Sequence, residues 1–237
     1  MAIYPTGVRP LLPAEAARRR SMERRLVEAL EKAGFGEIIL PIIDFEAPYA
    51  EIRGRDAARQ RYRFVDREGE LVAIRSDFTP MVARALAPSL GGETLPLRLF
   101  YRGDVIRCNG SRLGANREMF QIGAEIVGDA SPEADLETLR LASTLVTLAG
   151  FEPLVVISAG TFPADAAAAA GIALQFDDLE EDPGYYSGLR FRIYCRPGGT
   201  LAGQGGRYDA LYGLFGAAAP AVGFTLTIDD LAAGGGR

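Results

Sequence analysis

Two strand-like runs, LPLRLFYRGDVIR at residues 95–107 and REMFQIGAEIVG at residues 117–128, stand in the middle of this 237-residue sequence. A polar loop that contains glycines joins them, as in a long antiparallel pair. Further strand-like runs follow at 185–194 and 221–229, while helical patterns cover 13–33 and begin again at Ser131-Pro132-Glu133. We expect Leu148 on the buried side of this last helix, a helix cap at Thr79-Pro80, and a hairpin turn at Glu68-Gly69. Because helices and strands do not alternate strictly, the sequence predicts an α+β fold with a largely antiparallel sheet flanked by helices.

The composition excludes several classes of protein. The sequence has no histidine, so it cannot use Ser-His-Asp or Cys-His catalysis and lacks the commonest metal ligand. Its two cysteines, Cys108 and Cys195, are too few for a disulfide framework or a four-ligand zinc site. A net charge of −5 argues against a broad nucleic-acid surface. We therefore expect no metal, no cofactor and no nucleophilic hydrolase.

The apolar runs are all shorter than a membrane span, and residues 1–10 lack the charged and then apolar pattern of a signal peptide. We therefore expect a cytoplasmic protein without a membrane partner.

The glycine-rich stretch GGTLAGQGG at 198–206 has two interpretations. It resembles a phosphate-binding loop in composition only, because it lacks the Lys-Ser/Thr ending and the strand-to-helix position of such loops. Glycines that permit tight turns and close approach of neighbouring strands are the better interpretation.

Polar residues interrupt otherwise apolar runs at Asp77, Gln121, Glu125 and Tyr186. A buried polar side chain costs roughly 1–3 kcal/mol unless it is paired. These residues therefore form either an internal hydrogen-bond network or the lining of a pocket that suits an α-amino group and a polar side chain. The residues by themselves leave both readings open.

Six segments in a fixed order resemble the catalytic core of histidyl-tRNA synthetase, a class II synthetase, over nearly the whole chain. They are RSDFTP (75–80), RLFYRGDVIR (98–107), REMFQIGAEIVG (117–128), GYYSG (184–188), GGRYDAL (205–211) and AVGFTLTIDDL (221–231). PIIDFE at 41–46 resembles the first class II motif, which implies a homodimer through the segment around Pro41. The resemblance also implies one synthetase-like core domain over 1–237, with a short linker at about 159–183 in place of the usual insertion and no C-terminal anticodon-binding-like domain.

The resemblance implies that the pocket binds L-histidine. Asp77 and Thr79 match the positions that hold the α-amino group, and Arg107 would pair with the ligand carboxylate. The full set implied for histidine binding is Asp77, Thr79, Arg107, Gln121, Glu125, Tyr186 and Tyr208.

Four positions depart from the synthetase pattern, namely Asn109, Glu181, Asp229 and Asp230. The stretch from YRGDVIR to GAEIVG resembles the second class II motif, and Asn109 replaces its Glu. GFTLTIDDL resembles the third motif, and the two aspartates replace its Glu-Arg ending. Glu181 replaces an Arg that, by the resemblance, activates the histidine carboxylate. A carboxylate repels a triphosphate, so we expect synthetase-like ATP binding to fail.

A retained amino-acid pocket without the adenylation residues resembles the regulatory subunit of ATP phosphoribosyltransferase, a synthetase paralogue. That resemblance implies a subunit with no catalytic residues of its own, which activates the short catalytic subunit in a hetero-octamer at the first step of histidine biosynthesis. It also implies a part in feedback inhibition by histidine and no tRNA partner. Two alternatives stay open: a truncated histidyl-tRNA synthetase-like, histidine-activating enzyme, and a stand-alone histidine-binding paralogue.

Overall fold

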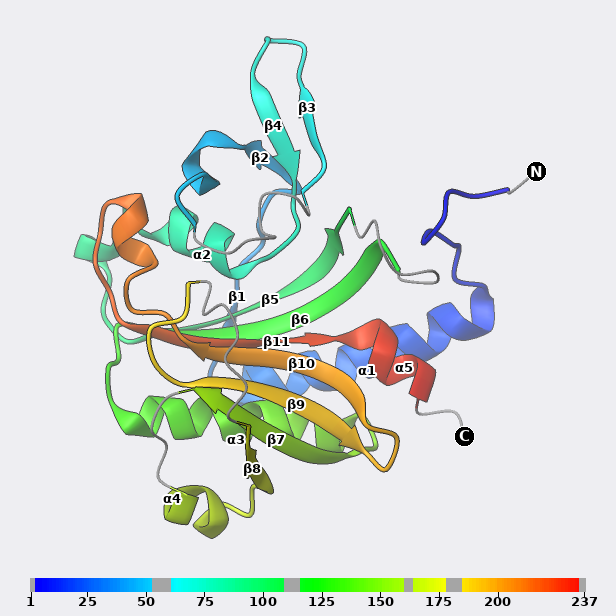
Figure 1. Cartoon of the computed structure of the whole chain (residues 1–237), viewed down its shortest axis with the longest axis vertical. Coiled ribbons are helices and arrows are strands. Elements are labelled where there is room, and N and C mark those ends of the chain that lie inside the picture. The colour runs from blue at the N-terminus through cyan, green and yellow to red at the C-terminus, as the bar shows by residue number, and fades with distance from the viewer. Residues whose placement is uncertain (1–2, 53–60, 109–115, 160–163, 178–184, 235–237) are drawn as a thin grey trace.

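An eight-stranded sheet forms the centre of the structure, a computed structural model that describes residues 3–52, 61–108, 116–159, 164–177 and 185–234. The strand order is β1-β5-β6-β11-β10-β9-β7-β8 (Figure 1). In chain order the strands are β1 (Gly36–Glu37), β5 (Leu97–Ile106), β6 (Glu118–Val127), β7 (Glu152–Ala159), β8 (Leu174–Phe176), β9 (Arg190–Arg196), β10 (Thr200–Arg207) and β11 (Ala221–Thr227). The inner pairings from β5 to β7 are antiparallel, and β1 and β8 join the two edges in parallel. This confirms the predicted α+β fold with a largely antiparallel sheet.

Helices α1 (Pro13–Lys32) and α3 (Pro132–Leu148) pack against one face of this sheet, and α5 (Ile228–Gly234) follows β11 (Figure 1). Both long helices have Pro in the first turn, and the Ser131 hydroxyl caps α3 by accepting a hydrogen bond from the Ala134 amide. Leu26 of α1 and Leu139 of α3 are fully buried in the core of this face.

The other face of the sheet is covered by α2 (Thr79–Leu86) and by the short 3₁₀ helices η1 (Ala47–Tyr49), η2 (Leu90–Gly92) and η3 (Tyr212–Phe215). Side chains alternate across a strand, so neighbouring residues of β5 enter different cores: Phe100 faces α1 and α3, whereas Tyr101 faces α2. The candidate site lies on the Tyr101 side.

A separate three-stranded sheet has the order β2-β4-β3, formed by β2 (Ile43–Phe45), β3 (Arg63–Val65) and β4 (Leu71–Ile74). Its β3–β4 hairpin projects away from the main sheet (Figure 1). The turn contains Glu68-Gly69 as predicted, and the Asp66 carboxylate holds it by accepting the amides of Glu68 and Glu70. Gly69 has φ of 87°, which favours glycine at this position.

The segment 159–183, which we predicted to be a short linker, is more ordered than that in its described part. It contains α4 (Ala164–Ala169) and β8, and β8 extends the main sheet beside β7. Ala167 and Ile172 are buried in the main core, because an alanine run forms helix readily and the apolar residues after it have a sheet edge to cover. The linker prediction is corrected for these residues.

Among the described residues, no helix is both long enough and apolar enough to cross a membrane.

Candidate functional site

A cavity of about 230 Å³ opens above the centre of the main sheet, on the side of α2. Its wall is formed by residues from the start of α2, β6, β10, β11, α5 and the segments that follow β4, β5 and β10 and precede β9. The polar side chains on this wall belong to Asp77, Thr79, Arg107, Gln121, Tyr185, Tyr186, Gln204, Tyr208, Thr225, Thr227 and Asp230.

Six of the seven residues predicted for histidine binding lie on this wall, although they are spread over more than half of the chain. Gln121 lies on β6, Arg107 directly follows β5, and Tyr208 directly follows β10. The seventh residue, Glu125, is also on β6, and even spacing in a strand places it on the same face as Gln121. It is 1% exposed and lies behind the wall, in contact with Thr79.

Thr79 does not act as the helix cap that the sequence suggested. Phe78 occupies the cap position of α2 without a side-chain hydrogen bond. The Thr79 hydroxyl instead donates to Glu125 Oε1 at 2.7 Å, because a buried carboxyl group needs a donor more than the helix end does. Thr79 thus connects the first turn of α2 to the floor of the cavity.

Two acidic side chains define the electrostatics of the cavity. The pKa of Glu125 is raised to about 8, mainly by burial and also by the nearby Asp77, while the hydrogen bond from Thr79 opposes the shift. Burial also raises the pKa of Asp77, while the Arg107 charge and a 3.2 Å hydrogen bond from the Tyr185 hydroxyl lower it. Glu125 is therefore largely protonated near pH 7, and a cation brought close to both carboxyl groups would favour their ionised forms.

Several buried polar atoms at the site have no hydrogen-bond partner among the described residues. They include Gln121 Oε1, Glu125 Oε2 and the hydroxyl oxygens of Tyr208 and Tyr212. Each such atom costs roughly 1–3 kcal/mol unless a ligand or water satisfies it. Gln121 Oε1 is an acceptor, and Glu125 Oε2 becomes one when the carboxyl group ionises, so the site suits a ligand that brings N–H donors and positive charge. Unpaired atoms favour the pocket interpretation over a closed internal network.

Three tyrosines stand together at one side of the cavity. The Tyr185 and Tyr186 ring centroids are 4.9 Å apart, and Tyr208 meets Tyr185 edge to face at 5.8 Å. Tyr186 and Tyr208 were predicted from the sequence, whereas Tyr185, which donates a hydrogen bond to Asp77, and Tyr212, whose buried hydroxyl has no partner among the described residues, were not. The adjacent pair at 185–186 was the available signal for Tyr185, whereas nothing local distinguished Tyr212.

Glycines in the central strands leave room for the polar groups. Gly223 of β11 pairs with Glu125 of β6, and a Cβ at Gly223 would overlap Glu125 Oε2. At Gly203 and Gly205 of β10, a Cβ would overlap backbone oxygens of β11. The glycine-rich stretch therefore serves close approach of strands, as the second interpretation proposed.

The two aspartates that replace the third-motif ending have different surroundings. Asp229 accepts a hydrogen bond from the Phe120 amide at 2.7 Å and pairs with Arg19 of α1 at 3.4 Å. Asp230 lies on the cavity wall, and burial raises its pKa, helped by Asp229. Asn109 and Glu181, the other two departures, lie outside the described residues. In the part of the chain that the structure covers, no group of three or more acidic or cysteine side chains is arranged to hold a metal ion.

The fold and the site define a class II aminoacyl-tRNA synthetase-like core. A sequence model of the family described as histidyl-tRNA synthetase matches residues 7–173 and 162–231. The chain belongs to the histidyl-tRNA synthetase family.

Two solved structures share this fold at low sequence identity. An ATP phosphoribosyltransferase regulatory subunit/histidyl-tRNA synthetase from Bacillus halodurans superposes with a TM-score of 0.87 at 21% identity, covering 100% of this chain and 84% of that one. A histidine–tRNA ligase subunit from Alicyclobacillus acidocaldarius gives a TM-score of 0.83 at 24% identity, covering 98% and 97%.

The curated relatives in this comparison are named ATP phosphoribosyltransferase regulatory subunit. The protein from Geobacter metallireducens is 40% identical over 156 residues, which are 65% of this chain and 36% of that protein. The protein from Thiobacillus denitrificans is 29% identical over 98% of both chains. The match to the first of these spans about a third of the relative's length.

Proposed function

We propose that this chain is a non-catalytic regulatory subunit of ATP phosphoribosyltransferase, which activates the short catalytic subunit and takes part in feedback inhibition by L-histidine. The observation that carries the proposal is the charge of the cavity wall. Asp77 and Asp230 stand on it, Arg107 is the cation among its described residues, and Glu125 directly behind would add a negative charge when a cation favours its ionised form. Such a site favours an ammonium group and disfavours a triphosphate.

L-Histidine fits the unpaired groups of the cavity. Its α-amino group would pair with Asp77, which already accepts a bond from Tyr185, and its imidazole N–H would reach the unpaired oxygen of Gln121 or, once that group ionises, of Glu125. Its carboxylate would pair with Arg107, whose Nε already donates to the Ser76 carbonyl at 2.9 Å and so holds the guanidinium in place. The tyrosines would enclose the ring.

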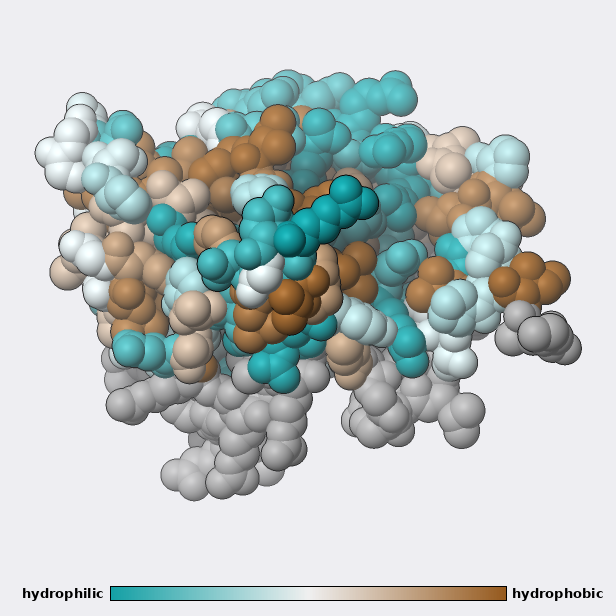
Figure 2. Space-filling model, turned by 90° about the horizontal axis from the view of Figure 1, so that it is seen from above, coloured by the Kyte–Doolittle hydropathy of each residue, from teal (hydrophilic) through white to brown (hydrophobic). Residues whose placement is uncertain are grey.

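A catalytic partner is part of the proposal, because the relatives carry the name of a subunit. We propose a hetero-octamer that contains homodimers of this chain formed through the segment around Pro41. Large apolar side chains beside Pro41 support this dimer: Ile39 is 87%, Ile42 57% and Ile43 49% exposed. Figure 2 shows the molecule from above the view of Figure 1, and apolar residues are exposed there among hydrophilic ones on the face toward the β3–β4 hairpin. Replacement of Ile42 by Glu should convert the dimer to a monomer in sedimentation velocity experiments.

The central test mixes the purified chain with the short catalytic subunit from the same genome. We expect phosphoribosyl-ATP formation to rise strongly when both proteins are present and to fall again when L-histidine is added. D-Histidine serves as the control for stereospecific binding. No activation together with no co-migration on a sizing column would refute the regulatory function.

A separate assay addresses the two alternatives. Histidine-dependent pyrophosphate exchange with ATP above background would indicate a histidine-activating enzyme. Histidine binding without exchange and without any association with the catalytic subunit would indicate a stand-alone histidine-binding protein. The proposal predicts neither outcome.

A further inference from the structure

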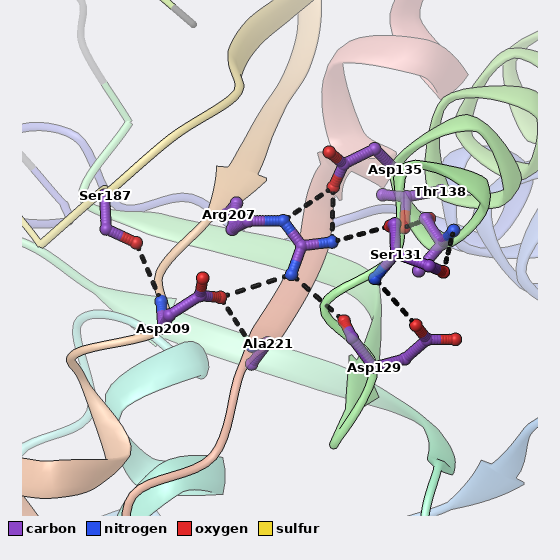
Figure 3. Close-up of polar contacts among 9 residues, drawn as sticks. Asp129, Ser131, Asp135, Thr138, Ser187, Arg207, Asp209 and Ala221 are labelled. Carbon is purple, nitrogen blue, oxygen red and sulfur yellow. Dashed lines mark hydrogen bonds and ion pairs between the residues drawn. The ribbon is translucent and has the colours of Figure 1, made fainter.

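Arg207, the last residue of β10, lies at the centre of a polar cluster beside the cavity (Figure 3). Its side chain is nearly buried, at 9% exposure, and it does not lie on the cavity wall. Nε and Nη2 donate to Asp135 Oδ1 at 2.9 and 2.7 Å, and Nη1 donates to Asp209 Oδ1 at 3.2 Å. The carbonyl oxygens of Asp129 and Ser131 accept the other two bonds, at 3.0 and 3.2 Å.

These bonds use all five N–H groups of the guanidinium. The acceptors lie at the start of α3: Asp135 is in its first turn, Ser131 is its cap, and Asp129 comes just before the cap. Helix α3 packs on the other side of the sheet from the tyrosines. Lysine has three donors that point from a single nitrogen, so it cannot reproduce this planar pattern. Arg207 therefore joins the end of β10 to the first turn of α3 in one defined geometry.

The same residue also holds the segment that carries Tyr185 and Tyr186. The Ser187 amide donates to the Arg207 carbonyl at 2.8 Å, and the Arg207 amide donates to the Leu189 carbonyl at 2.7 Å. The stem of Arg207 lies beneath Gly188, where a Cβ would meet its Cδ at 3.4 Å. The segment before β9 thus rests on Arg207 through two backbone bonds and one packing contact.

Asp209 completes the connection. Its Oδ1 accepts from Arg207 and from the Ala221 amide at the start of β11, and its own amide donates to Ser187 Oγ at 2.8 Å (Figure 3). Tyr208, a wall residue, lies between Arg207 and Asp209 in sequence. The cluster is therefore linked to the tyrosine side of the wall through Ser187 and Tyr208, and to β11 through Ala221.

We propose that Arg207 is a positioning residue that fixes the tyrosine wall of the ligand cavity, formed by Tyr185, Tyr186 and Tyr208, to the first turn of α3. The inference rests on the proposed function for the identity of the ligand, and on the hydrogen bonds alone for the positioning. Through Arg207, a ligand that closes the tyrosine wall would also affect the start of α3. In the same way, a disturbance of α3 would affect the tyrosine wall.

The test compares Arg207→Lys with Arg98→Lys, a matched control. Arg98 also binds α3, through two 2.9 Å bonds to Glu137, but these bonds do not reach the segment that carries Tyr185 and Tyr186. Amide hydrogen exchange is measured first on the full chain without ligand. In Arg207→Lys we expect the backbone amides at positions 187 and 207 to exchange faster than in the wild type. In Arg98→Lys we expect both amides to exchange at the wild-type rate. Ser187→Ala, which removes one exposed hydroxyl, should show the same change to a smaller degree, and it serves as a variant that keeps the buried cluster.

The second readout is L-histidine binding by calorimetry. We expect Arg207→Lys to bind roughly tenfold more weakly and Arg98→Lys to bind as the wild type does. An unchanged exchange rate of the backbone amide at position 187 in both Arg207→Lys and Ser187→Ala would overturn the positioning role. Faster exchange with histidine affinity equal to wild type would overturn the link to the ligand. A wild-type chain that binds no histidine would refute the proposed ligand, while the exchange data would still decide the positioning role.

Discussion

Replacement of Glu125 by Gln should change how the stability of the protein depends on pH. Glu125 is buried, and its pKa is raised from the ordinary 4.5 to about 8. Between these two pH values the folded protein keeps a proton at Glu125 that the unfolded chain has lost. The stabilisation from this proton is therefore complete below about pH 4.5 and is lost as the pH rises toward 8.

The size of the effect follows from the linkage relation. Within this window the free energy of unfolding of the wild type falls by up to about 1.4 kcal/mol per pH unit through Glu125 alone. The Gln variant lacks this titration but keeps an oxygen that can accept the Thr79 bond. We therefore expect the stability of Glu125→Gln, relative to wild type, to rise by roughly 2–3 kcal/mol between about pH 5.5 and about pH 7.5.

The measurement is urea unfolding followed by circular dichroism at several pH values, with no ligand present. The difference between variant and wild type is the quantity to compare, because other raised carboxyl groups, such as Asp77 and Asp230, titrate in both proteins. Glu28→Gln, at an exposed position of α1, controls for the substitution itself. A difference that stays constant across the pH range would refute the reasoning.

Three further predictions concern the site and its support. Asp77→Ala and Tyr208→Phe should each weaken inhibition of the assembled enzyme by histidine without preventing co-migration with the catalytic subunit; unchanged inhibition in both would count against this cavity. Gly223→Ala should lower the free energy of unfolding by more than about 2 kcal/mol, since the new Cβ would overlap the buried Glu125 carboxyl, and a chemical melt would measure it. Ser131→Ala should cost about 1 kcal/mol through loss of the α3 cap, seen as a lower midpoint in thermal unfolding.

Much of the local structure could be predicted from periodicity and from turn residues. The start of α3 at Ser131-Pro132 and the turn at Glu68-Gly69 are decided by residues within a few positions of each other. One detail of α3 was wrong: Leu148, expected on the buried side, is 38% exposed. The buried stripe continues through Val146 and Ala149, because neighbouring elements decide which stripe of a helix is covered at its end.

The members of the site could be predicted by resemblance, but their arrangement could not. Six predicted residues stand on one wall, yet Glu125 lies behind it, and Thr79 bonds Glu125 where a helix cap was expected. Asp229 and Asp230 are neighbours in sequence, but one faces Arg19 and the other faces the cavity. Successive residues of a helix point about 100° apart, so their environments depend on what packs on each side.

The sequence by itself determined most of the strands and helices, though not α4 and β8, and the set of polar residues placed among apolar ones, because these depend on contacts between residues that are close along the chain. The tertiary structure alone decided that Gly223 faces Glu125, that Tyr185 reaches Asp77, and that Arg207 ties β10 to α3. These contacts join residues 72 to 108 positions apart. They depend on the register of paired strands and on how helices pack across the sheet, which no local pattern encodes.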